Sequence, residues 1–319
     1  MSNPRGRRLA AAALLAFALA PSRARACDLC SIYTGSLMQQ EKTGFALAVA
    51  EQYGDFASIR QDGHSRSNPA NERIDSSITQ LVVAYSFLSW LGIQADAPLV
   101  SRDYRRIEDG TPTHGSVGGL GDISLLARVS PYSHAFGDTL VHMELLAGIK
   151  LPTGDTHRLF EELSEPPGGN PSTVHGHDLA LGTGSVDGLF GASAHVSWKR
   201  LFGDAALQYA VRSRGDAAYQ YANDLTWEAA PGLYLLLEHT YTAALRVVAS
   251  GEYKSRDHQG GELQDDTAIT SVYLGPGVQM TWSDSLHVDL TVDVPVVEDV
   301  TGRQLVPNYR LRGGVVWRF

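Results

Sequence analysis

The chain has 319 residues, 43% hydrophobic and 19% charged, and carries a formal net charge of −9 at pH 7. It is too apolar for a disordered protein, and its acidic balance disfavours a nucleic-acid-binding protein. Thirty-two glycines and a recurring polar–apolar alternation favour an all-β fold over a bundle of membrane helices.

The first 26 residues have the form of a cleaved secretory signal. Three arginines between positions 5 and 8 precede an apolar run over 9–20, and small residues precede a cleavage point after Ala26. A single transmembrane helix is the weaker alternative, because about twelve apolar residues cannot span a hydrocarbon core of ~30 Å. Removal of residues 1–26 leaves 21 basic against 35 acidic residues, a net charge of −14.

The segment 27–42 is expected to lie in the periplasm and carries the only two cysteines, Cys27 and Cys30. An exported CxxC favours a short disulfide or a redox pair, because it meets oxidising conditions. Covalent haem attachment is disfavoured, since Ser31 stands where a histidine would follow. Lipidation of Cys27 is a weaker alternative because the preceding residues form a poor lipobox, and a metal or electron-transfer role stays open.

Twelve segments between residues 43 and 319 alternate between apolar and polar residues with the period of a β-strand. The clearest runs from Leu286 to Val294, where every second residue is apolar. Most segments have close to the ~9–11 residues that a tilted strand needs to cross a membrane. The predicted strands are 43–53, 77–87, 91–101, 119–130, 139–151, 185–198, 204–214, 224–235, 241–253, 267–281, 285–296 and 309–319.

The connections between these segments alternate in length. Short turns are predicted near 88–90, 131–138, 199–203, 236–240 and 282–284, and long loops at 54–76, 102–118, 152–184, 215–223, 254–266 and 297–308. Short periplasmic turns, long external loops and an even strand number with both termini in the periplasm are typical of outer-membrane barrels. A soluble β-sandwich would show similar alternation but would not explain the signal segment and the loop lengths.

The last strand has one apolar face, with Trp317 and Phe319, and one cationic face, with Arg310, Arg312 and Arg318. Such a strand is predicted to close the barrel against lipid and to be bound by the barrel assembly machinery. Tryptophans near predicted strand ends favour the membrane interface: Trp90, Trp198, Trp227, Trp282 and Trp317. The sequence therefore predicts a transmembrane antiparallel up-and-down β-barrel over 43–319, in the outer membrane of a Gram-negative bacterium.

Three glycine-containing stretches, 119–128, 148–155 and 181–191, resemble the outer-membrane transporter family named for the meta-pathway of phenol degradation. The resemblance covers about residues 40–319 and includes the stretch 274–279 and the closing strand. It implies a barrel that imports small molecules, sometimes aromatic ones. It supplies no catalytic residue, because glycine motifs of this kind specify geometry more than chemistry.

Charged and polar side chains on the inward face are predicted to line a channel: Asp96, Asp122, Arg128, His142, Glu144, Lys150, Asp187, His195, Arg212, Glu228, Arg246, Glu252, His287, Asp289, Asp293, Arg310 and Arg312. Asp289 and Asp293 are expected to pair with Arg310 and Arg312 on the next strand. Twelve strands lie between a filled barrel of ~8 and a wide channel of ~16, so a narrow polar passage and a barrel filled by ion pairs both stay open. This set supplies no apolar opening for a greasy ligand.

Six of the eleven histidines fall in predicted long loops, and His175, His177 and Asp178 stand within four residues. Two histidines two apart on an extended segment point the same way and are a candidate site for Cu²⁺ or Zn²⁺. The alternative is that they are ordinary histidines of an exposed loop. No other cofactor is expected.

No Gly-x-Ser-x-Gly motif and no paired nucleophile and base occur in the sequence, so an enzyme is not predicted. The favoured function is a channel or transporter for small solutes, including aromatic or other small organic compounds. The alternatives are metal-related transport or binding, a barrel partner of a periplasmic redox protein, and a purely structural or partner-binding barrel. The sequence specifies neither the solute nor the oligomeric state.

Overall fold

The computed structural model describes residues 43–108, 110–163, 172–283 and 285–319. The predicted signal segment 1–26 and the segment with Cys27 and Cys30 lie outside these residues. None of the helices in the described part of the chain has the length and apolar character needed to cross a membrane.

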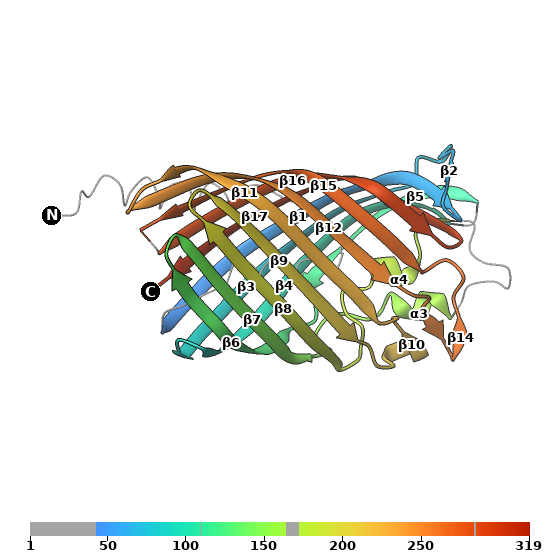
Figure 1. Ribbon diagram of the computed structural model, residues 1–319. Helices are drawn as coiled ribbons and strands as arrows, with labels where there is room; N and C mark the ends of the chain where they lie inside the picture. Colours follow the sequence, from blue (N-terminus) through green and yellow to red (C-terminus); the bar gives the residue numbers. More distant parts are fainter. Residues whose placement is uncertain (1–42, 109, 164–171, 284) are drawn as a thin grey trace, which may run out of the picture.

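Twelve long antiparallel strands form a closed barrel (Figure 1). Each pairs with its neighbours in sequence, and the last strand pairs with the first from Ala46↔Arg318 to Gln61↔Arg303, which closes the sheet. The predicted fold class is confirmed, and every predicted strand has a counterpart. The strands are β1 (Gly44–Gln61), β3 (Arg73–Leu88), β4 (Leu91–Glu108), β6 (Ser124–Phe136), β7 (Thr139–Lys150), β8 (Asp187–Trp198), β9 (Leu201–Val211), β11 (Asp224–Leu237), β12 (Tyr241–Lys254), β15 (Ile269–Trp282), β16 (Leu286–Val300) and β17 (Arg303–Arg318).

The shorter elements gather at the end of the barrel opposite the C-terminus (Figure 1). This end also holds the long connections between strands, whereas the turns at the C-terminal end are short. The shorter elements are β2 (His64–Arg66), β5 (Thr111–Leu120), α3 (Leu159–Glu162), α4 (Gly176–Leu179), the 3₁₀ helix η1 (Asp216–Ala218), β10 (Tyr219–Gln220), β13 (His258–Gln259) and β14 (Glu262–Leu263).

Three of the predicted long loops, 54–76, 102–118 and 297–308, are largely strand. β4 continues to Glu108 and pairs with β5, and β16 and β17 are joined by a two-residue turn at Thr301 and Gly302, where the glycine has φ of 61°. These strand ends carry polar residues on both faces, as at Arg102 and Asp103 of β4. The alternation that marks a membrane strand is therefore lost there, although each strand still pairs with at least one neighbour.

The outer surface of the barrel carries an apolar belt. Outward side chains such as Leu245, Val247, Leu290 and Val292 are 47–53% exposed, which in water would be unfavourable over so large a surface. Four predicted interface tryptophans lie at the end with the short turns, in or beside strand ends: Trp90, Trp198, Trp282 and Trp317. The belt faces lipid, and the end with the short turns is the periplasmic one.

Leu290→Arg tests this belt, because it places a cation in mid-belt on β16. We expect the free energy of unfolding in lipid vesicles to fall by about 2–4 kcal/mol. The matched control is Leu263→Arg in β14, a leucine of similar exposure, 56% against 47%, at the long-loop end. Its effect should stay within about 0.5 kcal/mol. Equal effects of the two substitutions, measured by urea titration, would contradict a lipid-facing belt.

Candidate functional site

The inward faces of the strands carry the predicted charged and polar set into the barrel interior. Fourteen of its residues are buried, and His195, Glu252 and His287 are half-buried. Burial of so much charge requires opposite charge nearby, since an isolated buried ion is strongly destabilising. The buried residues are Asp96, Asp122, Arg128, His142, Glu144, Lys150, Asp187, Arg212, Glu228, Arg246, Asp289, Asp293, Arg310 and Arg312.

The closing strand supplies the cations of one ion-pair layer. Arg310 Nε lies 3.0 Å from Asp293 Oδ1, and Arg312 contacts both Asp293 Oδ2 at 2.8 Å and Glu228 Oε2 at 2.6 Å. The Arg310 guanidinium also stacks 3.3 Å from the ring centre of Tyr273. Asp293 therefore pairs across the strands as predicted, whereas Asp289 pairs with Arg246 of β12.

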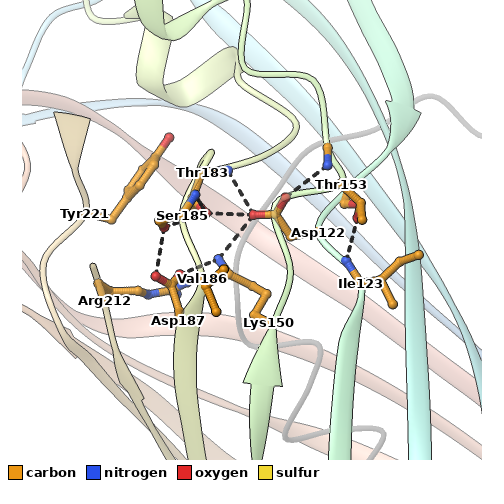
Figure 2. A network of polar contacts seen from close by, with 12 residues as sticks. Asp122, Ile123, Lys150, Thr153, Thr183, Ser185, Val186, Asp187, Arg212 and Tyr221 are labelled. Atoms are coloured by element: carbon orange, nitrogen blue, oxygen red, sulfur yellow. Dashed lines mark hydrogen bonds and ion pairs between the residues drawn. The ribbon is translucent and has the colours of Figure 1, made fainter. Parts of the chain in front are cut away.

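A second ion-pair layer joins the extracellular ends of β7, β8 and β11. Lys150 Nζ lies 3.0 Å from Asp187 Oδ2, and Arg212 lies 3.1 Å from the same carboxylate (Figure 2). Arg212 also lies 2.5 Å from Asp224 Oδ2. Two further pairs join side chains of neighbouring strands. Arg128 lies 2.7 Å from Glu144, and His195 Nδ1 lies 2.7 Å from Asp204 Oδ1.

The long connection between β7 and β8 folds into the extracellular mouth of the barrel. We call its described C-terminal part, residues 172–186, the inner loop. Arg102 of β4 donates to the carbonyl oxygens of Asp178 at 2.5 Å and Ala180 at 2.7 Å. Asp122 accepts from the Thr183 N–H at 2.8 Å and from the Gly154 N–H at 3.0 Å (Figure 2). The inner loop is therefore held by charge-assisted hydrogen bonds from the barrel wall.

The start of the inner loop is anchored by a buried carboxylate. Glu72, beside the first residue of β3, accepts from Ser172 Oγ at 2.7 Å and from the Thr173 N–H at 2.8 Å. Val174 and Leu179 then pack into an apolar cluster with Ile74 and Tyr104. The sequence placed these residues in an external loop, but the structure places them inside the barrel.

His175 and His177 lie on the inner loop, not on an exposed loop surface. Their rings stack with centres 5.5 Å apart, and the ring of His177 also stacks 5.7 Å from Tyr219. His175 Nε2 lies 3.3 Å from Asp266 Oδ2, and His177 Nδ1 lies 2.9 Å from Glu162 Oε1. Asp178 accepts from the backbone N–H of His175 at 3.0 Å.

Each imidazole thus faces its own carboxylate. In the described ranges, no group of three or more histidine, cysteine, aspartate or glutamate side chains is arranged to hold a metal ion. Divalent metal binding by His175, His177 and Asp178 stays a prediction.

A cavity of about 290 Å³ lies under the inner loop and has two chemically different walls. The wall formed by β1, β3, β4 and β17 is mainly apolar, with Phe56, Ile74, Ile78, Val100 and Val306, and polar side chains such as Gln80 and Asp96 lie at its margin. The wall formed on the other side of the ring is polar and includes Gln208, Arg212, Asp224 and Glu252. Lys150 and Arg310 also line the cavity, so both ion-pair layers border it directly.

The apolar wall corrects the sequence-based picture of a lumen without an apolar surface. Ile78 and Val82 point inward, while Leu81 and Val83 on the same strand are 41% and 48% exposed on the outside. Because both faces of this segment are apolar, alternation alone does not reveal an inward set. Arg102 was missed as well, since it lies in the stretch predicted to be a loop.

This sequence matches no protein-family model and no curated protein. The fold is similar to the crystal structure of an outer membrane channel from Pseudomonas putida F1, with a TM-score of 0.61 and 15% identity over 87% of this chain and 96% of that chain. The chain is therefore an outer-membrane β-barrel with a fold known from a channel protein. At this identity the likeness concerns the fold alone, so membership of the phenol meta-pathway family stays a prediction.

Two further solved structures are less similar. The translocator domain of the autotransporter NalP from Neisseria meningitidis has a TM-score of 0.43 and 13% identity over 91% of this chain and 93% of that chain. The CymD monoaromatic hydrocarbon channel has a TM-score of 0.39 and 9% identity over 89% and 90%. These low scores carry no functional weight.

The ion pair between His177 and Glu162 predicts a pH window for docking of the inner loop. Burial alone would lower the pKa of His177, but the nearby carboxylates of Asp178 and Glu162 raise it from 6.5 to about 10. Burial would raise the pKa of Glu162, but His177 lowers it from 4.5 to about 2. The stabilisation by His177 is complete below pH 6.5 and lost as pH rises through about 10, and that by Glu162 is complete above pH 4.5 and lost as pH falls toward 2.

Hydrogen-exchange protection of the backbone amides of Ala180 and Leu181, corrected for intrinsic rates and measured with a chelator present, should therefore be highest between pH 4.5 and 6.5. His177→Gln should flatten the alkaline side of this profile, and Glu162→Gln the acidic side. A wild-type profile that is flat between pH 4 and 10 would contradict the ion pair as an anchor.

Proposed function

We propose that this barrel is a channel for small organic solutes that have an apolar body and a polar end. The observation that carries the proposal is the two-sided cavity, with isoleucine, valine and phenylalanine facing glutamine, arginine and carboxylates across one space. Binding sites for small molecules combine an apolar surface with a few polar groups that fix orientation. A purely polar passage would not need the apolar wall.

The cavity size limits the solute. A volume of about 290 Å³ lies at the lower end of the ~300–1,000 Å³ typical of ligand pockets, so a single aromatic ring with small substituents is the matching scale. The charges on the polar wall are largely paired, as in Arg212 with Asp187 and Asp224. Because paired charges attract a further ion weakly, neutral or weakly polar solutes are favoured over strongly charged ones.

The fold supports the same proposal, since the Pseudomonas putida structure is that of an outer membrane channel. The proposal includes export by the signal segment 1–26 and a periplasmic disulfide or redox pair at Cys27 and Cys30.

Metal-related binding by His175, His177 and Asp178 is the second candidate, favoured by the parallel stacking of the two imidazoles beside the cavity. Cu²⁺ titration of His175→Ala with His177→Ala tests it, and an unchanged stoichiometry would remove these residues from the proposal.

The channel proposal predicts that a solute such as 4-hydroxybenzyl alcohol reduces the single-channel current in planar bilayers. Ile78→Gln replaces part of the apolar wall and should raise the concentration for half-block by about 5–30-fold, as expected for a loss of ~1–2 kcal/mol of apolar contact. Gln80→Ile is the matched control, because Gln80 lines the same cavity two residues along β3. It should not weaken the block.

Two results would contradict the proposal. Absence of discrete openings in the wild-type protein would favour a barrel filled by ion pairs. Equal half-block concentrations for the wild type and Ile78→Gln would show that the apolar wall does not contact the solute.

A further inference from the structure

The ladder between β16 and β17 stops halfway along the two strands. It runs from Leu286↔Trp317 to Asp293↔Arg310 and does not continue, although β16 extends to Val300 and β17 begins at Arg303. Residues 294–300 and 303–309 have ladder pairs only with the strands on their other sides: β16 pairs with β15 up to Val300, and β17 pairs with β1 from Arg303. The Val300 carbonyl also accepts from the Gly63 N–H at 3.2 Å. We call these two facing stretches the unpaired seam.

Local sequence explains why the seam does not close. Pro295 lies in one stretch and Pro307 in the other, and proline has no N–H to donate to a ladder. Both outer ladders also shift register at this level, at Val272/Tyr273 opposite β16 and at Phe56/Ser58 opposite β17. Bulges bend strands and disrupt pairing. By contrast, the β4–β5 hairpin at the same end of the barrel pairs without a break up to Glu108↔Thr111.

Neighbouring contacts hold the two sides of the seam in place. On the β17 side, Asn308 donates to Asp55 at 2.7 Å and accepts from Ser58 at 2.6 Å, which ties this stretch to β1. Within the upper half of the seam, Arg60 reaches from β1 to Glu298 of β16 at 2.8 Å, and above the seam the Gly302 N–H donates to Asp62 at 2.9 Å. The apolar part of the seam therefore lies between the Arg310–Asp293 pair below and the Arg60–Glu298 pair above.

The seam joins two surfaces that are otherwise separated by the barrel wall. Both of its sides line the cavity, through Val300 and Glu298 of β16 and through Leu305 and Val306 of β17. On the outside, Val294, Val296 and Val297 are 47–55% exposed and continue the apolar belt. Asn308 and Asp55, next to it on the outer surface, mark the polar limit of the belt on β17 and β1. The seam thus lies where the belt meets the outer membrane surface.

Unpaired backbone is not stable against lipid tails, because each unsatisfied group costs several kcal/mol there. It is tolerated where it borders a water-filled cavity or the polar interface. The seam has seven residues on each side without a ladder between them. This is tolerated because the seam borders the cavity on the inside and the margin of the belt on the outside.

We infer that the seam is a lateral portal through which small organic solutes with an apolar body pass between the outer margin of the lipid layer and the cavity. The inference rests on the proposed function for the class of solute. An apolar ring crossing at this level meets valines outside and Leu305 and Val306 inside, and it reaches the apolar wall of the cavity between the Arg310–Asp293 and Arg60–Glu298 pairs.

The test uses the full chain in lipid nanodiscs and needs no solute and no current. A fluorophore is attached at Val306→Cys, on the portal, or at Ile78→Cys, on the apolar wall away from it; the exposure of both native side chains is 4%, and both line the cavity. Lipids brominated near the headgroup end of their acyl chains act as a short-range quencher. We expect quenching at 306 to exceed that at 78 by about threefold, because only the portal lets bromine reach contact distance.

Val300→Cys, on the other side of the seam, provides a second label in case the Val306 variant fails to fold, as judged by heat-modifiable gel migration. It should be quenched like the label at 306. Iodide in the water is the control and should quench all of the labels. Equal quenching by brominated lipid at position 78 and at the seam positions would then overturn the portal. Since the channel proposal is tested by solute block of current, either proposal can fail while the other stands.

Discussion

The structure depends on one constraint: within a hydrocarbon layer, every backbone N–H and C=O must find a partner in the protein. Pairing of β17 with β1 meets this constraint for the whole sheet, because it removes the two edges that an open sheet would expose. Closure then fixes the side-chain pattern, since successive residues of each strand must point alternately to lipid and to the interior. The apolar belt and the charged lumen are two results of the same closure.

The charged lumen follows from the size of the ring. Twelve strands enclose an interior narrower than that of a wide pore, so inward charges lie within reach of one another, both on neighbouring strands and between strands further apart in the ring. Arg312 can therefore contact both Asp293 and Glu228, and Asp187 can contact both Lys150 and Arg212. Arg312 and Asp187 are each shared by two partners of opposite charge, so loss of one partner would leave a buried charge with less compensation. Such layers cross-link the strands of the barrel. The cavity at the extracellular end is then the space lined by both apolar and charged side chains.

The sequence predicted the strands well where lipid imposes alternation and poorly where it does not. The stretch 286–294 alternates perfectly and lies in β16, while Arg102 and Asp103 lie in a strand that the sequence assigns to a loop. Inward charges were recognisable because an ion cannot face lipid. Ile78 was not, because Leu81 and Val83 make the outer face of the same strand equally apolar. The inward course of the inner loop depends on contacts between residues far apart in sequence, such as Arg102 with Ala180, and no local pattern encodes such a contact.

The structural effect of Pro295 and Pro307 depends on which residues face them on the neighbouring strand, and this cannot be read from the local sequence. Each proline alone is compatible with a strand end; the sequence places Pro295 at the end of the predicted strand 285–296 and Pro307 in the predicted loop 297–308. The structure places them on facing stretches beyond the last ladder pair, at a level where one side of the wall borders the cavity and the other borders the belt. A solute in the cavity that moves toward the periplasm meets the layer of Arg310, Arg312 and Asp293. A solute that moves sideways meets valine, leucine and proline. For a solute that uses the portal, apolarity selects the route, because crossing the ionic layer requires displaced ion pairs, whereas the seam between the Arg310–Asp293 and Arg60–Glu298 pairs presents mainly valine, leucine and proline.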